Sequence, residues 1–327
     1  MNSLNKILTI GIPVYNGERT IEDTIESILI QLDDNLKDKV EILISNNHST
    51  DKTKEIVEKY KNKFPKNIYI YDNDTPELEL DGNLINLFKL SKGKFVWIMS
   101  DDDVFYPNSI EYILALIEKY GDDLGLIFVN YTECDKYLNE NSFREREDID
   151  ISCMCENGDE FFIKSKVLFG LLSSLIFKRE KWNEVDFKKY IGLKSLHIGA
   201  LIEVLSNNKS YIVADKLIKL RTGNTTWGDN GTFIFYMLNI VKILQNISRL
   251  NYKKSTYNYA INHFYKETYK LIIRAKINGL SETKKLLYEE VHCYRYKVRF
   301  WILDVYLIFL PTFFLIFLKK MFYKGKK

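Results

Sequence analysis

The sequence has few cysteines, and their arrangement argues against both a disulfide scaffold and a structural zinc site. Four cysteines occur in 327 residues, and Cys153 and Cys155 form a CxC pattern with no second pair at zinc-site spacing. With 46% hydrophobic and 14% aromatic residues, a chain of this length can form a core without either kind of cross-link. We expect the cysteines to be ordinary thiols in a reducing compartment.

An export signal and a long internal repeat are also missing. The N-terminal stretch "MNSLNKILTIGIPVYN" has no charged region followed by an apolar one, so no export signal is expected. A dominant charge is absent as well, because the net charge is only +3. Residues 1–240 nevertheless carry 29 basic and 39 acidic side chains, whereas residues 241–327 carry 18 and 5. The basic tail suggests contact with an anionic surface, and the alternative is a solvated pair of basic helices.

The first 130 residues alternate between short apolar runs and amphipathic segments. The runs in "KILTIGIPVYN", "VEILISNNHSTD", "NIYIYDND", "KFVWIM" and "LGLIFVNYTE" are typical of buried strands. The segments between them, such as "ERTIEDTIESILIQL", place apolar residues at helical spacing. This alternation predicts βαβ units in an α/β fold with a mostly parallel sheet. Residues 171–221 are expected to add a strand, a helix and a strand, and residues 230–295 are expected to be helical.

Three polar clusters follow predicted strands, at Pro13–Asn16, Asn46–Asp51 and Asp101–Asp103. Ligands of open α/β sheets bind beyond the carboxyl ends of the strands, where these clusters should converge. Adjacent carboxylates raise one another's pKa, and Asp101–Asp103 contains no basic residue. Oxygen ligands of this kind suit Mg²⁺ or Mn²⁺, with a diphosphate beyond the metal. The alternative is an acidic loop at the start of the helix that begins at Ser109.

Three sequence blocks together resemble the family 2 glycosyltransferases with the GT-A fold. The blocks are "IPVYNGERTIEDTIESI", "ILISNNHSTDKT" and "KGKFVWIMSDDDVFYP", in the family's order and spacing. The resemblance covers roughly residues 6–125 and extends more weakly to about residue 227. "WIMSDDD", followed by "YIG" and a histidine, is similar to the branch that contains abequosyltransferase-like O-antigen enzymes.

This resemblance implies transfer of a sugar from a nucleotide diphosphate donor, with inversion at the anomeric carbon. The first block would surround the nucleoside with Pro13, Val14, Tyr15, Asn16 and Glu18. In the second block the family usually has Asp-Asp-Gly-Ser, but Asn46 and Asn47 stand here. This departure leaves uridine, cytidine and thymidine diphosphate donors open.

The resemblance also implies roles at the reacting atoms. Asp102 and Asp103 would contact the metal and the ribose, and Asp101 is the next candidate for these contacts. The base that deprotonates the acceptor hydroxyl would lie near the helix "LHIGALIEVL", where His197, Asp186 and Glu203 are candidates. A histidine can act as a base near neutral pH, and the alternatives for His197 are an acceptor contact or a structural role.

Further donor contacts are expected from other parts of the chain. Arg221 and Trp227, in "LRTGNTTWG", occupy the place of the family's loop that closes over the donor phosphates. Arg221 could neutralise diphosphate charge, and Trp227 could stack on a sugar ring or anchor the loop. Asn83 either faces the donor or caps a helix.

The sequence predicts a catalytic domain over residues 1–227 and a helical, basic C-terminal region over residues 228–327. Residues 300–318 form an apolar run with Asp304 and Pro311 inside it and basic residues on both sides. We expect peripheral or re-entrant attachment to the cytoplasmic face of an anionic membrane, with a buried core helix as the alternative. The expected partners are a nucleotide sugar and a glycan acceptor on a polyprenyl carrier, and no nucleic acid.

Two other functions remain open at this point. One is an inactive GT-A domain that binds a glycan, which the intact Asp101–Asp103 cluster argues against. The other is a nucleotidyltransferase, which would need a glycine-rich basic loop where "GIPVYNGERT" stands.

Overall fold

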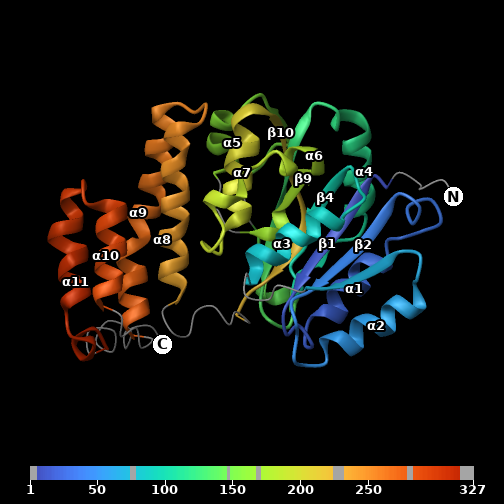
Figure 1. Ribbon diagram of the computed structural model, residues 1–327, viewed down its shortest axis with the longest axis horizontal. Coiled ribbons are helices and arrows are strands. Elements are labelled where there is room, and N and C mark those ends of the chain that lie inside the picture. The colour runs from blue at the N-terminus through green and yellow to red at the C-terminus, as the bar shows by residue number, and fades with distance from the viewer. Residues whose placement is uncertain are drawn as a thin grey trace. The chain divides into compact units, whose positions relative to one another are not determined.

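A computed structural model of the chain describes residues 6–73, 79–145, 148–166, 171–223, 232–277 and 283–316. The chain divides into two compact units, Met1–Asn224 and Thr225–Lys327, which are coloured blue to yellow and orange to red in Figure 1. Trp227, and residues 317 and 318 of the apolar run, lie outside the described residues. All four cysteines are free thiols.

The N-terminal unit is built on one sheet flanked by helices (Figure 1). The order of its main strands is β3-β2-β1-β4-β9-β6-β10-β5, with β7 paired to β6 and β8 paired to β10. The strands are β1 Leu8–Val14, β2 Val40–Asn46, β3 Ile68–Asp72, β4 Phe95–Ile98, β5 Val104–Phe105, β6 Leu124–Cys134, β7 Arg144–Glu145, β8 Cys153–Cys155, β9 Leu175–Lys178 and β10 Lys209–Arg221.

The first four strands in chain order pair in parallel, as the alternating pattern predicts. β1 lies between β2 and β4, and β3 pairs with the outer side of β2. All seven residues of β1 and all seven of β2 are buried. Strands covered on both faces need continuous apolar runs rather than an alternating pattern, and both sequences have them.

The prediction of a mostly parallel sheet is wrong for the second half of the unit, where the sheet is mixed. β9 pairs antiparallel with both β4 and β6. The reason lies just before β9, where Ser173 Oγ accepts a hydrogen bond from Ser100 N at 2.9 Å. Because the chain enters β9 beside the carboxyl end of β4, the strand must run in the opposite direction. β5, β7 and β8 also pair antiparallel.

Helices of the N-terminal unit cover the sheet with apolar faces. In the first helix, Ile21, Ile25 and Ile28 are fully buried, as their spacing predicts. Burying each such side chain stabilises the fold by about 1.5–3 kcal/mol. The helices are α1 Ile21–Leu29, α2 Thr53–Lys63, α3 Glu79–Leu90, α4 Ser109–Tyr120, α5 Gly158–Ser165, α6 Arg179–Asn183 and α7 Leu196–Asn207, with 3₁₀ turns at Glu140–Ser142, Leu172–Ser174 and Phe187–Lys189.

The described part of the C-terminal unit is helical, as predicted. α8 packs on α9 and α10, and α11 packs on the same two helices (Figure 1). The elements are α8 Thr232–Gln245, a 3₁₀ turn Asn246–Arg249, α9 Lys254–Ile277, α10 Thr283–Tyr294, a π-helical turn Phe300–Asp304 and α11 Val305–Phe309.

The apolar run of this unit is not one continuous helix. α11 ends at Phe309, Leu310 is extended, and residues 312–316 are helical again after Pro311. Proline lacks the N–H that would continue the helix, which accounts for the break. Among the described residues, no helix has both the length and the apolar composition needed to cross a membrane.

Candidate active site

The first two polar clusters are joined by hydrogen bonds at the carboxyl ends of β1 and β2. Asn16 Oδ1 accepts from Thr50 N at 2.8 Å, and Asn16 N donates to Ser49 Oγ at 2.9 Å. Asn47 N donates to Val14 O at 2.8 Å. Asn16 has a φ of 55°, a left-handed conformation that asparagine tolerates better than most residues. The two loops therefore form one connected surface.

The neighbouring residues extend this connection. Gly17 N donates to Thr53 Oγ1 at 2.8 Å. Glu18 Oε2 accepts from Lys52 N at 3.1 Å, so the carboxylate is held against the start of α2. Tyr15 projects into solvent with 60% of its surface exposed. Pro13 lies within β1 and is buried. The aromatic ring of Tyr15 is thus the accessible apolar surface of the first cluster.

The third cluster lies against the loop that follows the first cluster, where Asp101 closely approaches Gly17. A Cβ atom added to Gly17 would lie 2.3 Å from Asp101 Oδ2 and 2.7 Å from Val14 Cγ2. Only a residue without a side chain allows this close approach. α1 holds the same loop from another side, since Thr24 Oγ1 donates to Asp103 O at 2.8 Å. The three clusters predicted to converge are therefore brought together.

Asp103 is the most deeply buried of the three carboxylates, with 3% exposure. Its Oδ2 accepts from Ser173 Oγ at 2.5 Å, and its Oδ1 accepts from Arg221 N at 2.8 Å. Burial, and then the charge of Asp102, raise the pKa of Asp103 to about 8, although both hydrogen bonds oppose the shift. Burial and Asp102 likewise raise the pKa of Asp101 to about 7. The cluster thus favours binding a proton or a cation at neutral pH.

Asp102 is half-buried, and its Oδ1 accepts from Ser100 Oγ at 2.5 Å. Within the described part of the chain, no group of three or more His, Cys, Asp or Glu side chains is arranged to hold a metal ion. Mg²⁺ commonly uses only one or two carboxylates and completes its shell with water and substrate phosphates. The residues present fit that mode, with Asp102 and Asp101 as the side chains able to supply the protein oxygens. Asp103, also predicted as a ligand, is 3% exposed and both of its oxygens accept hydrogen bonds from the protein.

Arg221 ends β10 and is engaged by the protein itself. Its Nε donates to Asp102 O at 2.7 Å, and its Nη1 donates to Lys136 O at 3.0 Å. Its Nη2 forms an ion pair with Asp23 at 2.8 Å. Only 7% of the residue is exposed. In this structure the guanidinium fixes the aspartate loop against α1.

The second cluster forms an amide network with the end of β3. Asn46 Nδ2 donates to Asp72 Oδ1 at 2.8 Å, and Lys54 Nζ contacts Asp72 Oδ2 at 2.7 Å. Lys54, and then Asn46, lower the pKa of the Asp72 carboxyl. Asn73 Nδ2 donates to Asn47 Oδ1 at 2.6 Å. The carboxylate that contacts Asn46 therefore comes from β3, although the block itself has Asn46 and Asn47 where the family usually has aspartates.

α3 links this edge of the sheet to the start of α7. Asn83 is 3% exposed, and its Nδ2 donates to Ser45 O at 2.9 Å while Ser45 Oγ donates to its Oδ1. Both ends of the Asn83 amide are thus used within the core. Asp81 accepts backbone hydrogen bonds from Gly192 and Lys194 at 3.0 Å each, and from Leu196 at 3.2 Å. The N-terminus of α7 is thereby held near the carboxyl end of β2.

The three candidate bases differ in their surroundings. His197 is 1% exposed, and neither ring nitrogen has a hydrogen-bond partner among the described residues. Burial lowers the pKa of His197 to about 3, so the imidazole is neutral. Glu203 Oε1 accepts from Tyr190 Oη at 2.7 Å and from Lys189 Nζ at 3.1 Å. Asp186 is half exposed.

Several residues that organise the site carry no recognisable signal in the sequence. Ser173 bridges Ser100 and Asp103, although "LLSS" is typical of an ordinary strand start. Gly17 and Asp81 act through close packing and backbone contacts. Such roles depend on which segments meet in space, so local pattern alone does not reveal them.

Comparisons with known proteins agree with this geometry. The sequence profile of the family described as Glycosyl transferase family 2 matches residues 9–177. Abequosyltransferase of Salmonella typhimurium is 31% identical over 211 residues, which are 61% of each chain. An uncharacterised glycosyltransferase of Rickettsia prowazekii is 30% identical over 54% of this chain and 49% of its own length. The chain thus spans about half to three-fifths of these curated relatives.

Solved structures show the same fold at low identity. The Staphylococcus aureus TarS structure superposes with a TM-score of 0.62 at 14% identity, over 92% of this chain and 89% of that one. A Pyrobaculum calidifontis mannosyltransferase, solved with GDP-Man and Mn²⁺, has a TM-score of 0.54 at 16% identity, over 98% and 88%. These similarities confirm the predicted GT-A-like α/β fold. Together with the profile match over half the sequence, they show that the chain belongs to glycosyl transferase family 2.

Proposed function

We propose that this protein transfers a sugar from a nucleotide diphosphate donor to a hydroxyl of a glycan acceptor, with inversion, during assembly of a cell-surface polysaccharide. The observation that carries the proposal is the meeting of three polar loops at one edge of the sheet. One of them presents Asp101 and Asp103, whose pKa values are raised to about 7 and 8. Such a site gains from a cation that accompanies a diphosphate.

The donor would lie across the first two clusters, with its diphosphate at the third. Tyr15 offers an exposed ring to the nucleoside, and the Asn46–Asp72 pair offers hydrogen-bonding groups to its base or ribose. Asp102 and Asp101 would hold Mg²⁺ or Mn²⁺, which neutralises the leaving diphosphate when bound. Arg221 would keep Asp102 in place through its backbone carbonyl.

The base would come from the region of α7. Asp81 ties the start of this helix to α3, and Asn83 ties α3 to β2. His197, in the first turn of α7, stays a candidate because neither ring nitrogen has a partner among the described side chains. With a pKa of about 3 the buried imidazole is a weak base, so this role requires the site to open to the acceptor. Asp186 and Glu203 are the alternatives. Glu203 already accepts hydrogen bonds from Tyr190 and Lys189, so its carboxylate is engaged by the protein.

Several relatives support the acceptor class. The Salmonella relative is named an abequosyltransferase, and a Bacillus subtilis relative, 31% identical over 109 residues, is named a minor teichoic acid biosynthesis protein. The Staphylococcus aureus relative is named a poly(ribitol-phosphate) β-N-acetylglucosaminyltransferase. All three names refer to glycosyl transfer or to surface polymers. These names support a surface glycan as the acceptor, and a polyprenyl lipid that carries this glycan is a further part of the proposal.

Saturation binding of a panel of nucleotide sugars in the presence of Mn²⁺ tests the donor part of this proposal. One nucleotide class should bind, and EDTA or Asp102→Asn should weaken that binding. Asp122→Asn is the matched control because Asp122 is an exposed carboxylate paired with Lys94. Metal-independent binding that Asp102→Asn leaves unchanged would contradict the proposed site. Release of pyrophosphate from a nucleoside triphosphate would instead indicate a nucleotidyltransferase.

A further inference from the structure

The end of the C-terminal unit exposes an unusual number of large apolar side chains. Six of them are 55–75% exposed within sixteen residues of sequence, and we call this set the outer apolar face. Its members are Val298, Trp301, Ile302, Tyr306, Phe309 and Phe313. Single exposed apolar residues are ordinary on soluble proteins, but so many within one short segment are typical of an interaction surface.

The opposite side of the same segment is also apolar and is already packed. Phe300, Leu307 and Ile308 are at most 8% exposed, and α11 packs on α9 and α10. The segment's acidic residue, Asp304, is turned inward and is fully buried. A surface helix normally directs its polar residues to water. Here the polarity is inverted, so the outer apolar face needs a second apolar environment.

The charges near this face indicate what that environment is. Among the described residues from 291 to 316, three side chains are Lys or Arg and one is acidic, the buried Asp304. These basic residues lie beside the start of the face in the sequence. Arg295 and Lys297 precede Val298, and Arg299 lies between Val298 and Trp301. Trp301 and Tyr306 lie within it, and such amphipathic rings favour the boundary between hydrocarbon and headgroups. Apolar and aromatic side chains beside positive charge match an anionic bilayer.

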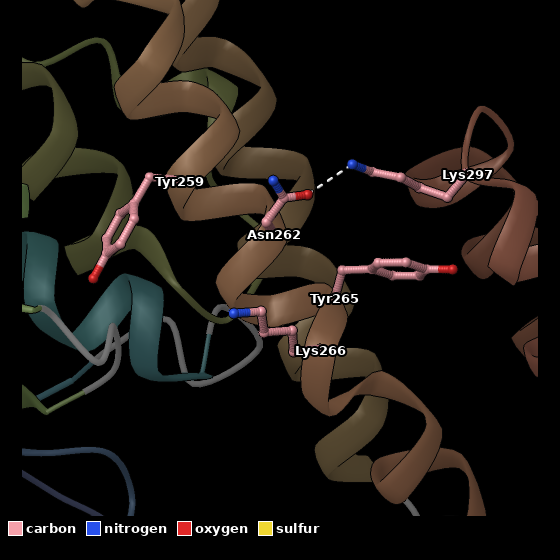
Figure 2. Close-up of a pocket in the computed structure, with 5 residues that line it drawn as sticks. All are labelled: Tyr259, Asn262, Tyr265, Lys266 and Lys297. Atoms are coloured by element: carbon pink, nitrogen blue, oxygen red, sulfur yellow. Dashed lines mark hydrogen bonds between the residues drawn. The ribbon is translucent and has the colours of Figure 1, made fainter.

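A pocket at the edge of this face has the same chemistry. It encloses about 470 Å³ and is lined by Tyr259, Asn262, Tyr265, Lys266 and Lys297, with no carboxylate among them (Figure 2). Lys297 Nζ donates to Asn262 Oδ1 at 2.7 Å, and Lys297 directly precedes Val298 of the face. In Figure 2, Tyr259 and Lys266 point to one side of α9, and Tyr265 and Lys297 lie on the other. The two ammonium groups therefore offer positive charge to more than one lipid phosphate.

We propose that the C-terminal unit docks on an anionic lipid bilayer through the outer apolar face, with lipid phosphates contacting Lys266 and Lys297. The proposal does not depend on the transfer reaction, since it rests on side chains of the C-terminal unit alone. A bilayer accounts for both the apolar face and the positive charge, whereas a second copy of this chain would bring two basic surfaces together.

The test is flotation of the full-length protein with vesicles of phosphatidylcholine, with and without phosphatidylglycerol. We expect binding that needs the anionic lipid and weakens at high salt. Replacing Trp301, Ile302 and Phe309 together by serine should lower the partition coefficient at least about tenfold. The matched control replaces three exposed apolar residues of the N-terminal unit, Ile30→Ser, Tyr137→Ser and Ile163→Ser, and should leave it unchanged.

A second variant covers the possibility that the serine variant folds poorly. Lys266→Gln with Lys297→Gln alters two lining side chains of the pocket and should weaken anionic-vesicle binding about fivefold per charge. Failure of the wild type to float with either vesicle overturns the proposal, and so does equal loss in the control variant. Light scattering gives another refutation: a stable dimer that the serine variant dissociates, with no vesicle binding, would show that the face joins two copies.

Discussion

Replacing Asp103 by asparagine should make the N-terminal unit more stable. Asp103 is 3% exposed, and burial together with Asp102 raises its pKa from 3.8 to about 8. Asparagine has nearly the same shape and can still accept the hydrogen bond from Arg221 N. The amide would meet Ser173 Oγ, which can accept as well as donate. The substitution therefore removes the free-energy cost of a buried carboxylate without opening a cavity.

The magnitude follows from the difference in proton binding between the two states. Above pH 3.8 the unfolded chain releases the Asp103 proton, whereas the folded protein keeps it to about pH 8. Stability then falls with rising pH by about 1.36 kcal/mol for each pH unit. Between pH 3.8 and pH 7 the loss reaches about 4 kcal/mol, an upper limit because neighbouring carboxylates share the titration. Asp103→Asn avoids this loss.

Urea unfolding in EDTA at about pH 4 and pH 7 measures the effect. The two proteins should be nearly equal at the lower pH, and the variant should be more stable by a few kcal/mol at the higher pH. Mn²⁺ should stabilise both proteins, because Asp101 and Asp102 remain in the variant and a cation that binds the folded state adds to its stability. A variant that is equally or less stable at pH 7 would refute the argument from burial.

Three other substitutions test separate parts of the structure. Gly17→Ala should lower kcat/KM and cost about 1–3 kcal/mol of stability, because its Cβ would collide with Asp101; unchanged kinetics would contradict that contact. His197→Ala should lower kcat by about 10²-fold with little change in donor affinity if the imidazole is the base; weakened donor binding with constant kcat would assign it to binding. Glu290→Gln should raise the melting temperature at pH 8 more than at pH 5, since burial and Asp304 raise the pKa of Glu290 well above its usual range. Equal melting temperatures at pH 8 would exclude a buried, proton-binding Glu290.

The order of elements in the first 130 residues could be predicted because each element leaves a local pattern. β1 and β2 are buried throughout and therefore appear as unbroken apolar runs. α1 has one buried face, which its isoleucine spacing reveals. The convergence of the three polar clusters followed from the parallel arrangement of β1, β2 and β4, since their carboxyl ends share one edge of the sheet.

Features that depend on distant segments could not be predicted in the same way. The direction of β9 is determined by where the chain returns, beside Ser100. The four residues of this strand, three of them apolar, contain no information about that. Arg221 has the residue type and position of a phosphate ligand, yet its nitrogens contact Asp102, Lys136 and Asp23. Residue type alone does not show whether a charge faces a ligand or the protein.

Turnover of a nucleotide sugar tests the central claim most directly. The purified protein would be given each nucleotide sugar with Mn²⁺ and a polyprenyl-linked glycan, and release of nucleoside diphosphate would be measured. We predict release with one donor class, lost in EDTA and in Asp102→Asn, and retained in Asp122→Asn, which alters an exposed carboxylate. Release that Asp102→Asn leaves undiminished, or no release with any donor while the protein remains folded, would contradict the claim that this site catalyses glycosyl transfer.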